Sequence, residues 1–145
     1  MIKERYLVPA YGPDEDALRT ALKSLEILGV KLKSDVAIVV PALNHAHSTI
    51  LNKIIPEKQL KLLIKGNSLT LGESNIKLSL VSQKTLNNTN AKVLLAVFAS
   101  KKIIQKIEAS ITCRAVIILP WAGEIDIKEW KEKWSPVVLD LNEKT

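Results

Sequence analysis

Five short segments of the chain are almost continuously apolar: residues 5–10, 36–40, 93–98, 115–119 and 137–141. Strands with one face in water alternate apolar and polar residues. Strands of a parallel sheet that helices cover on both faces do not alternate, because both sets of side chains are buried. We therefore predict that these five segments are buried strands of a mostly parallel sheet.

The segment after the first predicted strand has the period of an α-helix. Pro13 suits a first helical position, and Asp14, Glu15 and Asp16 follow it where the helix dipole favours acidic side chains. An apolar stripe then recurs at helical spacing, formed by Leu18, Ala21, Leu22, Leu25 and Leu28. Gly29 is interpreted as the end of this helix.

Pro56 divides the next helical pattern, because proline disfavours helical geometry at the residue before it. We predict one short helix from about Ser48 and a second from Pro56 to about Lys65. Over 68–82 apolar and polar residues alternate on both sides of the sequence GESN, which predicts an antiparallel hairpin. Further helices are predicted over 100–110 and 125–134.

Strands and helices thus alternate along the chain, with a hairpin in the middle. Right-handed crossovers would arrange these elements as a three-layer α/β sandwich, flavodoxin-like or Rossmann-like, with an inserted β-hairpin. At 145 residues, the chain is predicted to form a single domain over 1–145. The pattern does not fix the order of the strands in the sheet.

Composition places the chain among folded proteins, with 47% hydrophobic and 25% charged residues. No apolar run reaches the ~18–20 residues that cross a bilayer, and the first residues lack the pattern of a secretion signal. We expect a cytoplasmic protein without a membrane partner. The single cysteine, Cys113, is expected to be a buried, inert thiol.

The net charge of +6 is concentrated in the middle of the chain, where residues 34–112 carry ten basic and four acidic groups. Nucleic acid is the obvious acidic partner of such a segment. Only three of the 21 basic residues are arginine, however, and aromatic residues make up 4% of the chain. Both residue types read nucleic acids, so specific nucleic-acid binding is not expected.

Ligands of open parallel sheets lie beyond the carboxyl ends of the strands. This rule selects residues in four loops: Tyr11, Asn44 with His45, Ser100 with Lys101, and Trp121 with Glu124. Trp121 either lines a pocket in its loop or closes the core. Trp130 and Trp134, four residues apart, are predicted to pack the last helix against the sheet.

The two histidines, His45 and His47, can share a metal only in an extended segment, and they form an incomplete ligand set. We therefore predict no metal site. Capping of a strand-to-helix turn by Asn44 and Ser48 is the simpler interpretation of this segment. The alternative is that His45 acts as a ligand contact or general base. No phosphate-binding or dinucleotide-binding motif is present, so the cofactor stays unknown.

The helix predicted over 100–110 has Ser100 at its cap and Lys101 and Lys102 in its first turn. The helix dipole and both ammonium groups would attract an anion there. The alternative is that these lysines are only solvated.

The leading hypothesis is a non-catalytic ligand-binding or regulatory domain that holds an anionic small molecule at this corner, with Ser100, Lys101 and Lys102. A second hypothesis is an enzyme, a hydrolase or transferase, in which His45 acts as base and Glu124 or Asp140 assists. A third is a protein–protein interaction subunit or homo-oligomer that works through an exposed surface.

Overall fold

The computed structural model describes seven stretches of the chain: residues 3–8, 15–41, 51–71, 75–82, 84–86, 89–120 and 127–139. Its strands are β1 (Glu4–Leu7), β2 (Val36–Val40), β3 (Leu69–Leu71), β4 (Ile76–Ser82), β5 (Val93–Ala99), β6 (Ala115–Pro120) and β7 (Val137–Val138). Its helices are α1 (Glu15–Leu32), α2 (Leu51–Ile54), α3 (Glu57–Ile64), α4 (Lys101–Ala109) and α5 (Lys128–Trp134).

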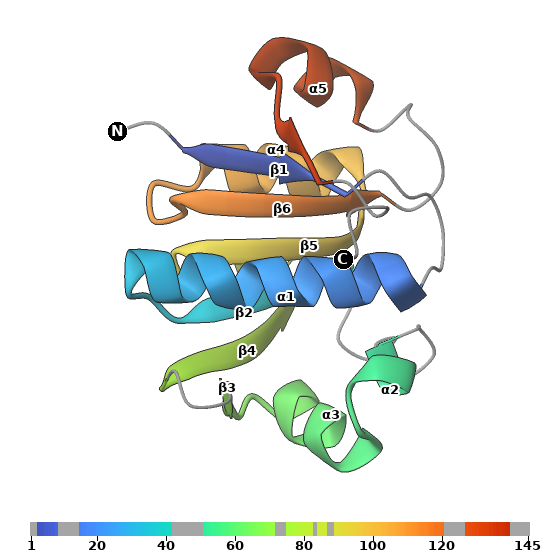
Figure 1. The fold of residues 1–145 in the computed structure, drawn as a ribbon, viewed down its shortest axis with the longest axis vertical. Helices are drawn as coiled ribbons and strands as arrows, with labels where there is room; N and C mark the ends of the chain where they lie inside the picture. The colour runs from blue at the N-terminus through green and yellow to red at the C-terminus, as the bar shows by residue number, and fades with distance from the viewer. Residues whose placement is uncertain are drawn as a thin grey trace.

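The strands form one sheet in the order β3-β4-β2-β5-β6-β1-β7 (Figure 1). Every neighbouring pair is parallel except β3 with β4, which is antiparallel. The predicted mixed α/β fold with a mostly parallel sheet is therefore confirmed.

Each face of the sheet carries its own apolar core. Along β2, Val36, Ile38 and Val40 join a cluster with side chains of α1, α2 and α3. The residues between them, Ala37 and Val39, join a second cluster with side chains of α4 and α5. Because helices cover both faces, neither set of strand residues meets water, which explains the continuous apolar runs. The result is a sandwich of helices, sheet and helices.

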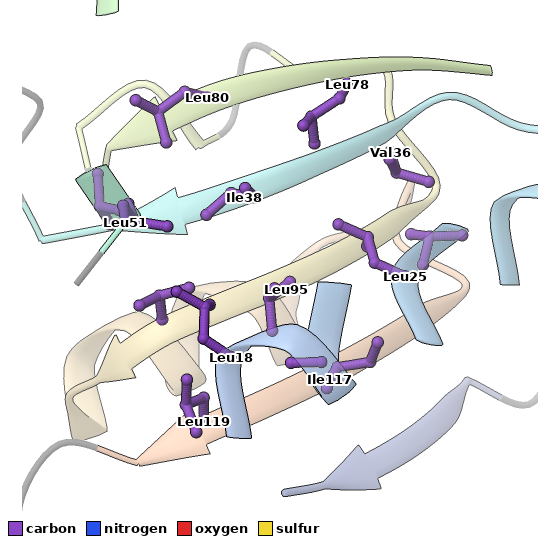
Figure 2. Packing of buried hydrophobic residues seen from close by; sticks show 14 of the residues in the cluster. Leu18, Leu25, Val36, Ile38, Leu51, Leu78, Leu80, Leu95, Ile117 and Leu119 are labelled. Carbon is purple, nitrogen blue, oxygen red and sulfur yellow. The ribbon is translucent and has the colours of Figure 1, made fainter. Parts of the chain in front are cut away.

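The core beneath α1 is drawn in Figure 2. Leu18 and Leu25 of α1 lie over the central strands, near Leu95 and Ile117, and Leu51 of α2 lies beside Ile38. Burial of this kind contributes roughly 1.5–3 kcal/mol for each large aliphatic side chain.

The order of the strands differs from what the names flavodoxin-like and Rossmann-like imply. In both of those orders the first two strands are neighbours. Here β5 and β6 lie between β1 and β2, and β1 pairs with β6 and β7 instead. The sequence predicted the layers, but the order depends on pairings between distant segments.

The predicted helices around Pro56 and the predicted antiparallel strands are present. α2 and α3 lie on either side of Pro56, and Leu69 of β3 is opposite Leu78 of β4. β4 also pairs in parallel with β2 along its length, so it is a strand of the main sheet.

The sequence predicted that the first helix ends at Gly29, but this prediction is wrong. α1 continues to Leu32, and Lys33 then adopts a left-handed conformation with φ of 52°. A Cβ atom on Gly29 would lie 2.6 Å from Cγ1 of Val36 and 3.1 Å from the carbonyl oxygen of Ser34. Glycine is needed here for the close approach of the helix to the start of β2, not for a helix cap.

The last predicted strand is shorter and less buried than expected. β7 comprises Val137 and Val138, which are 58% and 51% exposed. It lies at an edge of the sheet, where β1 is its one partner among the described strands. The apolar pattern over 137–141 predicts a buried strand, and sequence alone does not distinguish this from an exposed edge. Of this segment the structure describes residues 137–139.

Candidate functional site

Most of the residues selected from the carboxyl ends of the strands lie outside the described residues. These are Tyr11, Asn44, His45, Trp121 and Glu124, and Asp140 of the enzyme hypothesis also lies outside them. The same holds for His47. Their predicted roles in ligand contact or acid–base chemistry remain predictions.

Ser100, Lys101 and Lys102 are described, at the start of α4. The Ser100 hydroxyl accepts a hydrogen bond from the backbone N–H of Ile103, so it caps the helix as predicted. The Nζ atom of Lys101 lies 3.5 Å from a carboxylate oxygen of Glu129 on α5. Lys102 is exposed, with no ion-pair partner among the described residues. These contacts give Ser100 and Lys101 structural roles, and anion binding by Ser100, Lys101 and Lys102 stays a prediction.

A pocket of about 760 Å³ lies at the opposite end of the sheet, where β1 and β6 begin. β1 contributes Arg5 to it, and Lys3 and Arg114 are the residues directly before β1 and β6. The end of α4, the segment after it and the end of α5 complete the lining with Glu108, Ala109, Ser110, Ile111, Cys113, Lys133 and Trp134. Its volume is within the ~300–1,000 Å³ typical of small-molecule sites.

Lys3 joins the start of β1 to the end of α4. Its ammonium group donates hydrogen bonds to the carbonyl oxygens of Ile107, Glu108 and Ser110, at 2.8, 3.2 and 3.2 Å. The last carbonyl groups of a helix have no partner within the helix, and they form the negative end of its dipole. Lys3 therefore satisfies the end of α4 and brings one positive charge to the pocket wall.

Arg5 and Glu108 form a largely buried ion pair, with side chains 11% and 17% exposed. Arg5 donates from Nε to Oε2 at 2.9 Å and from Nη2 to Oε1 at 2.7 Å. The indole N–H of Trp130 also donates to Oε2 of Glu108, at 2.7 Å. One carboxylate thus connects β1, α4 and α5.

The three donors set the charge state of Glu108. Burial would raise the pKa of this carboxyl group. The hydrogen bonds from Arg5 and Trp130, together with the charges of Arg5 and Lys3, outweigh burial and hold the pKa below its usual range. Glu108 is therefore an ionised structural group, and its charge is matched by Arg5.

The two tryptophans of α5 have different environments. Trp130 is 5% exposed and lies in the core with α4, as the sequence predicted. Trp134 is 39% exposed and lines the pocket, so it contacts the sheet at the surface and does not join the core as Trp130 does. The guanidinium carbon of Arg5 lies 3.7 Å from the centre of the Trp134 ring. A cation on β1 therefore holds Trp134 beside the pocket rather than in the core.

Arg114 and Lys133 add two further cations to the pocket. Among the described residues neither forms an ion pair, and Nζ of Lys133 lies 5.1 Å from the centre of the Trp134 ring. With Lys3, they leave three positive charges in excess once Arg5 is matched with Glu108. The pocket wall therefore favours anions.

Cys113 lines the same pocket but is not suited to act as a nucleophile. It is 5% exposed, and its thiol donates to the carbonyl oxygen of Ala115 at 3.3 Å. Burial raises its pKa to about 11, so the reactive thiolate is scarce at neutral pH. The predicted burial of the thiol is confirmed, and its low reactivity stays a prediction.

A narrower groove of about 280 Å³ lies between α4 and α5. Lys101, Gln105 and Glu129 line one part of it, and it shares Glu108, Lys133 and Trp134 with the larger pocket. Within the described ranges, no three histidine, cysteine, aspartate or glutamate side chains are grouped to hold a metal ion.

Sequence reasoning missed the basic pocket because its residues come from distant segments. The available signal was the arginine content, since Arg5 and Arg114 are two of the three arginines and each lies at the beginning of a predicted strand. Only the pairing of β1 with β6 shows that the two residues are neighbours.

Comparison with protein-family models, curated proteins and solved structures found no match to this chain. Among the helices in the described ranges, none has both the length and the apolar character needed to cross a membrane.

Proposed function

We propose that this chain is a non-catalytic α/β domain that binds an anionic small molecule, and that the basic pocket at the start of β1 and β6 holds it. The observation that carries this proposal is the excess of positive charge on the pocket wall. Arg114 and Lys133 supply charge without a described acidic partner, and an arginine fork suits a phosphate or carboxylate.

The other ionisable groups of the pocket favour binding over catalysis. Glu108 is held ionised by Arg5 and Trp130, and Cys113 is held protonated by burial. Neither group has the intermediate pKa that suits proton transfer near neutral pH. A regulatory or ligand-binding role in the cytoplasm, where Cys113 stays reduced, agrees with this chemistry.

The test is thermal unfolding of the protein with inorganic phosphate, pyrophosphate and citrate. Binding at one hundred times the dissociation constant adds ~2.7 kcal/mol of apparent stability, which raises the unfolding midpoint by several degrees. We expect the double variant Arg114→Ala, Lys133→Ala to lose the shift.

The double variant Lys101→Ala, Lys102→Ala is the matched control, because it removes two exposed lysines from the corner at the other end of the sheet. We expect it to keep the shift. Loss of the shift in this control alone would instead place the anion at the start of α4. A wild-type protein that responds to none of the three anions would contradict the proposed function.

A further inference from the structure

Trp134 lines the pocket, but the proposed binding of a simple anion gives it no role. It lies one turn after Trp130, at the end of α5, and is 39% exposed where Trp130 is 5% exposed. A large aromatic side chain at the wall of a concave site is a common means of recognising a flat apolar group.

The position of Trp134 is fixed by its contact with Arg5, which is itself held in place. Arg5 covers one face of the indole ring at 3.7 Å from its centre. Arg5 is held in turn by two hydrogen bonds to Glu108 and a third to the carbonyl oxygen of Lys3 at 3.0 Å. Lys133 also lies over the ring, with Nζ 5.1 Å from its centre, and 39% of the Trp134 side chain remains exposed at the pocket. The indole is thus held in place by Arg5 and keeps part of its surface open for stacking.

The charge of the pocket suits a phosphate group better than a single carboxylate. A phosphomonoester carries a charge of about −1.5 to −2 at pH 7. Lys3, Arg114 and Lys133 provide three positive charges beyond the Arg5–Glu108 pair. Arg114 can bind two phosphate oxygens at once, and the mobile ammonium group of an exposed lysine can approach a third.

From these observations we infer that the pocket takes a planar aromatic molecule that carries a phosphate, of the nucleoside monophosphate class, with its ring stacked on Trp134 and its phosphate held by Arg114 and Lys133. This inference rests on the proposed function, since it names the class of anion. The pocket volume of about 760 Å³ allows both groups of the ligand to be held together.

The test compares whole ligands with their parts. AMP, GMP, CMP and UMP are titrated into the protein by calorimetry, beside ribose 5-phosphate, which lacks the ring, and adenosine, which lacks the phosphate. We expect at least one nucleotide to bind about fivefold or more tightly than ribose 5-phosphate, because base stacking on an aromatic side chain contributes at least about 1 kcal/mol. Adenosine is expected to bind more weakly than AMP.

Two variants assign the contributions to residues. Trp134→Leu keeps an apolar side chain but removes the aromatic face, so it should weaken nucleotide binding about tenfold and leave ribose 5-phosphate binding unchanged. Arg114→Ala with Lys133→Ala should weaken both ligands. The unchanged affinity for ribose 5-phosphate serves as the control that Trp134→Leu is folded.

Each alternative result has a distinct meaning. If all four nucleotides and ribose 5-phosphate bind equally, the stacking inference fails while the anion-binding function stands. If ribose 5-phosphate and the nucleotides all fail to bind, both fail. If adenosine binds as tightly as AMP, the site recognises rings rather than anions, which overturns both. If Trp134→Leu weakens nucleotides and ribose 5-phosphate alike, stacking is not the role of Trp134.

Discussion

Glu108 joins three elements through hydrogen bonds from Arg5 and Trp130 on either side of its own helix. Changing it to glutamine removes the negative charge and leaves the Arg5 guanidinium, 11% exposed, without an acidic partner. We expect Glu108→Gln to lower the free energy of unfolding by about 3 kcal/mol, as for other largely buried ion pairs that lose one member.

Urea unfolding measures this loss, and Glu129→Gln is the matched control. Glu129 is an exposed acid whose contact with Lys101 is 3.5 Å long, and exposed pairs of this kind contribute about 0–1 kcal/mol. Equal effects of the two substitutions would contradict a structural role for the Arg5–Glu108 pair.

The lowered pKa of Glu108 also predicts a dependence on pH. A carboxyl group whose pKa is lower in the folded than in the unfolded protein adds stability above its unfolded pKa, and this stability is lost as the pH falls through the folded value. The wild type should therefore lose its advantage over Glu108→Gln below the ordinary pKa of 4.5. Unfolding free energies of both proteins from pH 7 to pH 3 check this, and a constant difference would contradict it.

The raised pKa of Cys113 predicts slow reaction with thiol reagents. A pKa of about 11, against an ordinary value of 9.0, leaves ~100-fold less thiolate at pH 8, and burial slows the reaction further. We expect the thiol to react at least that much faster in denaturant. Equal rates in the folded and unfolded protein would show that the thiol is accessible.

At the scale of the elements, the packing of α1 on β2 depends on Gly29. Alanine is the better helix former, by about 1 kcal/mol. Its methyl group, however, would lie 2.6 Å from a Val36 methyl and 3.1 Å from a backbone oxygen. We expect Gly29→Ala to destabilise the protein by about 1–3 kcal/mol, as other overpacked substitutions do.

Thermal unfolding measures the effect of Gly29→Ala. Lys23→Ala on the exposed side of the same helix is the control, expected within about 0.5 kcal/mol of the wild type. A more stable Gly29→Ala protein would mean that the helix end can move away from Val36.

The elements themselves could mostly be predicted from local pattern. The proline at 56, the alternation over 68–82 and the apolar runs all depend on neighbours within a few residues, and each marks a real helix or strand. The errors concern distant contacts. Gly29 contacts Val36 across a turn, and the exposure of Trp134 depends on Arg5 of a strand far away in the sequence.

The basic pocket could not be predicted either, because its residues come from distant segments of the chain. Each cation is unremarkable in its local sequence, and no motif joins Lys3, Arg114 and Lys133. They become one site only through the sheet order and through the end of α4, which Lys3 holds in place.

For the whole molecule, the sheet order predicts a gradient of stability. β2, β5 and β6 are central and buried between the two cores, whereas β7 is a short edge strand with exposed valines. Amide hydrogen exchange should be slowest in the three central strands and fast at Val137 and Val138. Protection of β7 equal to that of β5 would indicate that another surface covers this edge.

β1 lies near the start of the chain, but both of its neighbours in the sheet, β6 and β7, come from the last third of it. Glu4 pairs with Ala115, and Tyr6 pairs with Val137, so both neighbours of the first strand are synthesised long after it. Contacts between residues so far apart in the sequence slow folding, because a long loop must close before they form. During synthesis β1 stays unpaired until β6 and β7 have been made, and an unpaired apolar strand is prone to aggregate. The nascent chain therefore passes through a period in which Leu7 and Val8 are open to self-association, although both are buried in the finished molecule.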